Sequence, residues 1–211
     1  MNEEKTIYLL RHAQTSLPDE KKRFVGQTNP PLSLSGLLQS SHLASVLSHH
    51  DLQGIYCSDL LRSEETAHII ASEFGLKAQS LKAFREVSLG DWDGLSFDEV
   101  RDKYPHEFDE RGKNIAYYRT PGGESFIDLR NRVLPEFFKI LSDGSGSIAI
   151  IGHAGVNRVI LCHILSIPLE KMFIIKQDYA TINTIIQSKM IFSVTAINNQ
   201  VSFEHSLVSS D

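Results

Sequence analysis

Two short apolar runs lie far apart in the chain, and each is followed almost at once by a histidine. The first, from Thr6 to Leu10, reads TIYLL, and the second, from Ile148 to Ile151, reads IAII. Continuous apolar strands of this kind are typical of a sheet covered on both faces. A third apolar stretch, Ile55 to Cys57, lies between two helical patterns, 35–48 and 58–74. This alternation predicts an α/β fold, a three-layer sandwich with a mostly parallel central sheet and helices on both faces.

The second half of the chain predicts further elements around the same sheet. A long helix is expected from about Ser125 to Leu141, and another from about Gly155 to Leu165. Segments 184–187 and 190–197 are rich in β-formers and predict a hairpin against the sheet edge. The charged and aromatic stretch 97–118 predicts a helical insertion over the sheet.

Composition narrows the class of protein. The chain has 211 residues, of which 41% are hydrophobic and 22% charged, the balance of one ordinary globular domain. We expect this domain to occupy residues 1–205 and a frayed tail to follow at 206–211. The net charge of -5 indicates no broad basic face, so no nucleic-acid partner is expected. The first apolar run is too short for a signal sequence or a membrane span, which favours a cytoplasmic protein without a membrane partner.

The two cysteines, Cys57 and Cys162, form no CxxC pair and have no partner cluster for a zinc site. We expect both to be reduced and structural, because a cytoplasmic compartment disfavours a disulfide. The sequence alone leaves a bond between them open.

The chemistry is expected where the two long apolar runs end. In open α/β sheets, ligands gather at the carboxyl ends of the strands, where loops converge and helix N-termini direct N–H groups outward. Arg11-His12 follows the first run, and Gly152-His153 opens a helix after the second. One histidine at a strand end is most often a hydrogen-bonded structural residue. Two such histidines, one beside an arginine, favour an anion site.

At this point the sequence resembles the histidine phosphatase superfamily, which includes cofactor-dependent phosphoglycerate mutases and many phosphatases. Five blocks in family order carry the resemblance over nearly the whole chain: Arg11-His12-Ala13-Gln14-Thr15; Gly26 to Ser33 with Gly36 and Gln39; Ser58 to Ala67; Phe84-Arg85-Glu86 with Gly90 to Gly94; and Gly152-His153.

The resemblance implies a role for each matching residue. His12 would be the nucleophile, Arg11, Arg62 and His153 would clamp the phosphate, and Glu86 would be the proton donor. We also assign Gln27 and Thr28, in the second block, to substrate binding. The resemblance implies no metal and no cofactor.

This assignment is consistent with the chemistry of phosphate transfer. A phosphate monoester is a dianion, so arginines that spread over its oxygens favour attack by a neutral nucleophile. Flanking arginines disfavour imidazolium, and a hydrogen bond from the other ring nitrogen to a backbone carbonyl would fix the tautomer. Ala13, Gln14 and Pro18 depart from the glycine, glutamate and asparagine common in the family.

The leading hypothesis is a metal-independent phosphomonoester hydrolase that acts through phosphohistidine on a small phosphorylated metabolite. The segments Gly90 to Gly94 and Thr120 to Phe126 resemble the α-ribazole-phosphate phosphatase branch, so α-ribazole 5′-phosphate of cobalamin synthesis is one candidate substrate. A phosphoglycerate mutase is the alternative, although the stretch between Glu86 and Gly122 is compact for one. A non-catalytic phosphate-recognition module is the third reading, and a homodimer through the sheet edge or tail stays open.

Substrate specificity should come from the insertion between Asp98 and Tyr118. Its aromatic residues are the expected contacts for the leaving group: Tyr104, Phe108, Tyr117 and Tyr118.

Overall fold

A six-stranded sheet forms the centre of the protein. The computed structural model describes residues 4–144 and 146–200, and its strands run in the order β3-β2-β4-β1-β5-β6. Strands β1 to β4 are mutually parallel where they pair, and β5 joins β1 in antiparallel fashion. The strands are β1 (Lys5–Arg11), β2 (Leu52–Cys57), β3 (Ala78–Ser80), β4 (Ser147–Gly152), β5 (Thr181–Ser188) and β6 (Ile191–Gln200).

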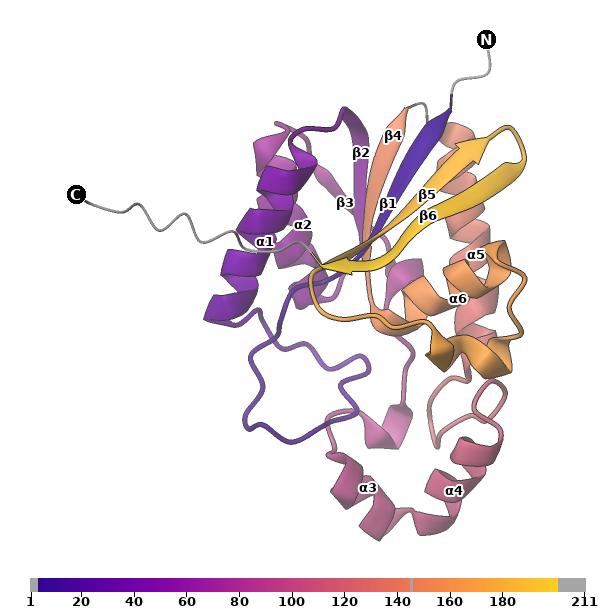
Figure 1. Ribbon diagram of the computed structural model, residues 1–211. Coiled ribbons are helices and arrows are strands. Elements are labelled where there is room, and N and C mark those ends of the chain that lie inside the picture. Colours follow the sequence, from indigo (N-terminus) through magenta and orange to yellow (C-terminus); the bar gives the residue numbers. More distant parts are fainter. Residues whose placement is uncertain (1–3, 145, 201–211) are drawn as a thin grey trace, which may run out of the picture.

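Helices cover both faces of the sheet, which confirms the predicted three-layer α/β fold. Figure 1 shows α1 (Leu34–Leu47) and α2 (Leu61–Glu73) on one face, and α5 (Phe126–Asp143) and α6 (Ala154–Ile164) on the other. The predicted insertion is the pair of short helices α3 (Phe97–Lys103) and α4 (Pro105–Lys113), which lie beyond one end of the sheet (Figure 1). Short 3-10 turns occur at Lys82–Phe84, Gly90–Trp92 and Leu169–Ile174.

The apolar runs build two cores because successive side chains of a strand point to opposite faces. Ile7 and Leu9 of β1 pack into the core under α5 and α6, together with Phe137 and Ile160. Tyr8 and Leu10 pack into the core under α1 and α2. A strand buried on both faces must be apolar at every position, which is why these runs show no alternation.

Several predicted boundaries shift by a few residues. The predicted helix over 58–74 begins only at Leu61, because Ser58 lies in the loop and its hydroxyl contacts His153. The predicted hairpin at the sheet edge is confirmed as β5 and β6, with its turn at Lys189 and Met190.

Both cysteines are buried and free, in agreement with the expected reduced state. The predicted frayed tail, 206–211, lies outside the described residues.

The register of the sheet brings the two histidines together. β1 and β4 are parallel neighbours, and Arg11 at the end of one pairs with Gly152 at the end of the other. His12 and His153 are therefore the next residues on adjacent strands, and the His12 N–H donates to the Gly152 carbonyl at 3.0 Å. The strand ends place both rings at the edge of the sheet where ligands are expected.

Candidate active site

His12 and His153 face each other with ring centroids 5.0 Å apart. The predicted meeting of these two residues is thus observed. The Nδ1 atom of His12 lies 2.8 Å from the Ala13 carbonyl oxygen, and Nε2 lies 3.2 Å from the Nε of Arg62. A carbonyl can only accept and a guanidinium can only donate. These two neighbours therefore put the His12 proton on Nδ1 and leave the lone pair on Nε2.

The environment also keeps His12 neutral. Burial lowers its pKa well below the usual range, and the charges of Arg62 and Arg11 lower that pKa further. The hydrogen bond to Ala13 acts in the opposite direction but does not prevail. A histidine with an unprotonated Nε2 at neutral pH is suited to nucleophilic attack.

Arg62 comes from the first turn of α2 and is almost completely buried. Its terminal nitrogens donate to the backbone carbonyls of Thr28 and Gly26, both at 2.7 Å. Burial lowers the pKa of Arg62 to about 10, and nearby Glu86 partly offsets that effect. The guanidinium stays charged at neutral pH and is held rigidly beside His12, as the predicted clamp requires.

Arg11 enters the site from the end of β1. One terminal nitrogen donates to the Gln177 carbonyl at 2.7 Å, and the guanidinium lies 3.8 Å from the ring centroid of Tyr179. Gln177 is itself fixed, because its side chain bonds to Asn157 and Asn183. This buried amide network could not be predicted from the sequence, because isolated Gln and Asn residues carry no motif.

His153 lies behind the cavity rather than on its wall. Its ring is completely buried, and Nε2 lies 2.6 Å from the hydroxyl oxygen of Ser58. Burial, followed by the charge of Arg62, lowers the pKa of His153 well below the usual range. Ser58 belongs to the third block of the family resemblance, which implies no role for it, and its contact with His153 could not be predicted from spacing.

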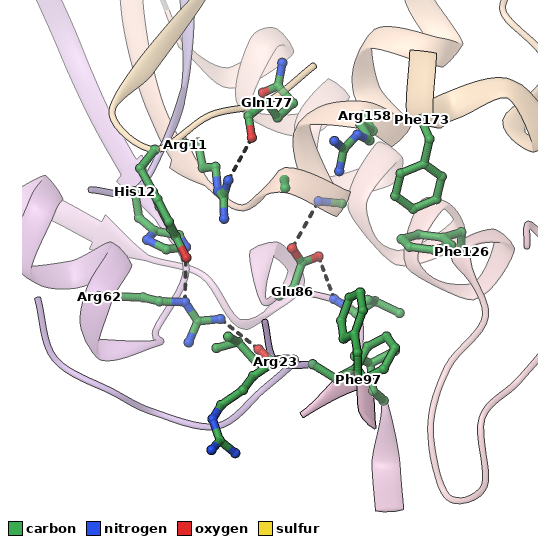
Figure 2. Close-up of a pocket in the computed structure, with 18 of the residues that line it drawn as sticks. Arg11, His12, Arg23, Arg62, Glu86, Phe97, Phe126, Arg158, Phe173 and Gln177 are labelled. Carbon is green, nitrogen blue, oxygen red and sulfur yellow. Dashed lines mark hydrogen bonds between the residues drawn. The ribbon is translucent and has the colours of Figure 1, made fainter. Parts of the chain in front are cut away.

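Glu86 lies on the loop after β3, and two backbone donors hold its carboxylate. Oε1 accepts from the Val87 N–H at 2.9 Å, and Oε2 accepts from the Gly155 N–H at 3.0 Å. Arg132 of α5 donates to the Glu86 carbonyl. Figure 2 shows Glu86 in the middle of the cavity, between the side of His12 and Arg62 and the side of Phe126 and Phe173. Glu86, the predicted proton donor, therefore lies on the wall of the same cavity as His12, the predicted nucleophile.

These residues line a cavity of about 340 Å³, within the range common for small-molecule sites. Its wall includes the predicted residues Arg11, His12, Arg62 and Glu86. The aromatic part of the wall differs from the expectation that Tyr104, Phe108, Tyr117 and Tyr118 contact the leaving group. Instead the aromatic residues on the wall are Phe24, Phe97, Phe126, Phe173 and Tyr179.

The physical reason is packing within the insertion. Tyr104 and Phe108 lie against Trp92, with ring centroids 6.1 and 6.4 Å away, and so belong to the core under the insertion. Tyr117 is half exposed and interacts with Glu170 outside the cavity. From the stretch 98–118, Arg111 is the residue that reaches the cavity wall.

Gln27 and Thr28 support the site from behind. The Gln27 side chain donates to the Glu86 carbonyl at 3.0 Å, and the Thr28 hydroxyl donates to the Val25 carbonyl at 2.6 Å. Neither side chain is part of the wall of the cavity that holds His12. Their assignment to substrate binding stays a prediction, and the observed contacts are those of residues that position Glu86 and the loop.

The departures from the family motif are accommodated without disturbing His12. Ala13 is completely buried, and its N–H donates to the Thr66 hydroxyl at 3.1 Å. Asn29, downstream of the Pro18 position, caps α2 through a bond from the Leu61 N–H at 2.6 Å. The Asn29 side-chain oxygen is thus occupied at the start of α2.

Within residues 4–144 and 146–200, no group of three or more His, Cys, Asp or Glu side chains could hold a metal ion. The helices of this part of the chain are too short or too polar to cross a bilayer.

Comparison with known families agrees with the geometry. The chain matches the histidine phosphatase superfamily (branch 1) over residues 7–200. It belongs to this superfamily. The expectation of a phosphatase-class enzyme is thereby confirmed at the level of the family. In this histidine phosphatase, His12 directly follows β1, whose last residue, Arg11, pairs with Gly152. The assignment of His12 as the nucleophile stays a prediction.

Individual relatives of this histidine phosphatase differ in their substrates. Phosphoserine phosphatase 1 of Hydrogenobacter thermophilus is 30% identical over 182 residues, covering 85% of this chain and 85% of the relative. The 6-phosphofructo-2-kinase/fructose-2,6-bisphosphatase of Caenorhabditis elegans is 27% identical over 170 residues, 80% of this chain. The chain spans only 36% of that relative's length. The solved α-ribazole phosphatase of Shigella flexneri shares the fold with a TM-score of 0.84 at 21% identity, over 93% of this chain and 99% of that one.

Proposed function

We propose that this histidine phosphatase is a metal-independent phosphomonoester hydrolase that acts through a phosphohistidine on a small phosphorylated metabolite. The observation that carries the proposal is the fixed tautomer of His12. Its Nδ1 faces the Ala13 carbonyl and its Nε2 faces Arg62. The reactive lone pair is thus already directed toward the cationic side of the cavity.

In the first step, Nε2 of His12 attacks the phosphorus atom and the bond from phosphorus to the ester oxygen breaks. Arg11 and Arg62 balance the charge on the equatorial oxygens, because both guanidiniums lie on the cavity wall. Glu86 delivers a proton to the departing oxygen. In the second step, water attacks the phosphohistidine, Glu86 takes one of its protons, and His12 leaves as the neutral imidazole.

His153 helps from the rear of the site. Its ring lies close to that of His12, and its low pKa keeps it neutral in the free protein. An arriving phosphate dianion would favour a proton on this ring, and the positive charge would then stabilise the dianion from behind the cavity wall.

The substrate is proposed only as a class. α-Ribazole 5′-phosphate is a candidate on the motif resemblance and on the shared fold of the Shigella flexneri phosphatase. The relatives named for phosphoserine and for fructose 2,6-bisphosphate add phosphorylated acids and sugar phosphates to the class.

The test is a chelator-resistant assay of the purified protein with p-nitrophenyl phosphate and a metabolite-phosphate panel that includes α-ribazole 5′-phosphate. We expect turnover that is lost in His12→Ala and kept in His68→Ala, because His68 is exposed on α2. Quenching in alkali should recover a phosphorylated protein that acid discharges. Interconversion of phosphoglycerates without release of phosphate would establish the mutase alternative. Binding of phosphorylated compounds without turnover would establish the recognition module.

A further inference from the structure

The cavity carries more positive charge than one phosphate requires. Its wall holds the arginines Arg11, Arg23, Arg62, Arg111 and Arg158, against a single carboxylate, Glu86. Arg11 and Arg62 are used by the proposed phosphate clamp. The remaining three are therefore either paired within the protein or available to a ligand.

Arg23 is paired within the protein. Its Nε donates to an Asp19 carboxylate oxygen at 3.0 Å, and a terminal nitrogen donates to the Gly94 carbonyl, also at 3.0 Å. Glu99 lies 3.5 Å from the same guanidinium. With carboxylates on both sides, Arg23 has little net charge to offer a ligand.

Arg111 has no such partner. In the described part of the chain its guanidinium makes no ion pair and no hydrogen bond, and its surroundings are aromatic rings. The nearest ring centroids are those of Phe24 at 5.6 Å and Phe126 at 5.7 Å. Burial lowers the pKa of Arg111 to about 10, so it remains a cation at neutral pH. A largely desolvated cation on a cavity wall is best balanced by an anion that enters the cavity.

Arg158 lies next to the same aromatic pair. Phe126 and Phe173 are in edge contact with centroids 5.7 Å apart, and the Arg158 guanidinium lies 4.8 Å from the Phe173 centroid. Its Nε donates to the Ile175 carbonyl, which leaves the terminal nitrogens without a bond in the described residues. Figure 2 shows Arg158, Phe126 and Phe173 on the side of Glu86 away from His12 and Arg62.

We propose that Arg111 and Arg158 form a second anion subsite, so that the preferred substrate is a phosphate monoester whose leaving group carries a carboxylate or a second phosphate. This inference rests on the proposed function, because the subsite is defined relative to a phosphate held at Arg11 and Arg62. The leaving group extends from His12 past Glu86 and reaches the Phe126 and Phe173 pair, where the two guanidiniums bind its anion. Such compounds should therefore have a higher kcat/KM than α-ribazole 5′-phosphate, which has a single phosphate.

The test compares substrates that differ in the second anion alone. One pair is 3-phosphoglycerate and glycerol 3-phosphate, in which a hydroxymethyl group replaces the carboxylate. The other is fructose 1,6-bisphosphate and fructose 6-phosphate. We expect wild-type kcat/KM to favour the doubly anionic member of at least one pair by about 10-fold or more. Whichever pair shows the preference identifies the anion as a carboxylate or a phosphate.

Substitutions of Arg111 and Arg158 then test whether these two residues cause the preference for a second anion. Arg111→Met and Arg158→Met should each lower the ratio of the two kcat/KM values by about 10-fold, since a hydrogen bond to a charged group is lost. Arg101→Met is the matched control, because Arg101 is an exposed arginine of the same insertion outside the cavity, and it should keep the wild-type ratio. Thermal unfolding checks that each variant folds. If one of the two arginine variants fails to fold, the other still tests the subsite.

Binding separates this inference from the proposed function. Calorimetric dissociation constants of the four compounds with the His12→Gln variant should show the same preference and the same dependence on Arg111. Preferential binding without any wild-type turnover would overturn the hydrolase and keep the subsite. Turnover of p-nitrophenyl phosphate that depends on His12, with a ratio near one for both pairs or a ratio unchanged by the arginine variants, would overturn the subsite alone.

Discussion

A single backbone carbonyl decides which nitrogen of His12 can react. The Ala13 oxygen holds the Nδ1 proton at 2.8 Å, and Arg62 occupies the Nε2 side until a phosphate arrives. Glu86 is fixed in a similar way, by the N–H groups of Val87 and Gly155. In the proposed mechanism both groups would enter the reaction already oriented, which lowers the entropic part of the barrier.

Glu86 is predicted to donate a proton to the leaving group. Glu86→Gln should lower kcat/KM for an alkyl phosphate by about 10²–10⁴, the usual contribution of a general acid. The loss with p-nitrophenyl phosphate should be about 10-fold at most, because p-nitrophenolate leaves without a proton. Glu73→Gln, on the exposed side of α2, should change neither rate. Equal losses on both substrates would remove Glu86 from the role of acid.

A second prediction concerns the hydroxyl of Ser58. The His153 ring makes a 2.6 Å contact with that hydroxyl through Nε2, and its Nδ1 has no partner in the described residues. Ser58→Ala would leave both buried nitrogens unpaired, so we expect a loss of about 1–3 kcal/mol in the free energy of unfolding. Urea denaturation measures it, with the exposed Ser72→Ala as control. A change no larger than that of the control would mean that the contact contributes nothing.

The sequence could name the charged residues of the site but not their partners. His12, Arg11, Arg62 and Glu86 stand out because motifs and strand ends mark them. Ser58 and Arg111 do not, since their importance depends on contacts across the fold. The four aromatic residues expected to line the cavity were the wrong ones, because sequence cannot tell which ring packs under a helix and which faces the cavity; of the insertion's aromatic residues, Phe97 lines the wall.

Among the elements, the junction of β4 and α6 holds the carboxylate of Glu86 against the end of the sheet. The N–H of Gly155, in the first turn of α6, bonds to Glu86. A Cβ at Gly155 would lie 2.3 Å from Glu86 Oε1 and 3.1 Å from the Leu129 side chain. Glycine at this position therefore lets helix, loop and carboxylate meet closely.

This close approach leads to a prediction for Gly155→Ala. The methyl group must displace the Glu86 carboxylate, so kcat/KM for an alkyl phosphate should fall about 10²-fold, with a smaller loss for p-nitrophenyl phosphate. Gly112→Ala in α4 is the matched control, because a Cβ there meets nothing within 4 Å. The control should keep full activity and gain up to about 1 kcal/mol of stability. Full activity in Gly155→Ala would show that Glu86 tolerates displacement.

Elements were more predictable than contacts because each has a local cause. The two apolar runs became β1 and β4 since strands covered on both faces lack polar positions. The short strand β3 and the turn at Leu169–Ile174 carry too few residues to form a pattern. The second helix begins later than expected, because Ser58 lies in the loop before it, where its hydroxyl contacts His153 and its N–H donates to the hydroxyl of Ser63 in α2.

At the scale of the whole molecule, the site is built where the two cores meet. β1 contributes Leu9 to the core under α5 and α6 and Leu10 to the core under α1 and α2. His12 and His153 follow the strands that separate these cores, and both rings are almost fully buried. Burial keeps both imidazoles uncharged in the folded protein, so protonating them should lower the free energy of unfolding.

That linkage predicts how stability depends on pH. The folded pKa values of His12 and His153 lie well below the ordinary 6.5, so the unfolded chain binds more protons than the folded one below pH 6.5. Stability is therefore complete above that pH and falls as pH decreases toward the folded pKa values. Both buried rings therefore lower the free energy of unfolding as pH falls below 6.5. Asp93, whose pKa burial raises, acts weakly in the opposite sense.

Urea unfolding at pH 7 and pH 5 in a phosphate-free buffer measures this difference. His12→Gln should reduce it, because one of the two buried imidazoles is gone and glutamine does not titrate. His49→Gln and His106→Gln should leave it unchanged, since both side chains are exposed. A free energy of unfolding that stays constant between the two pH values would mean that the buried rings accept protons without cost, and would contradict the neutral His12 that the proposed mechanism requires.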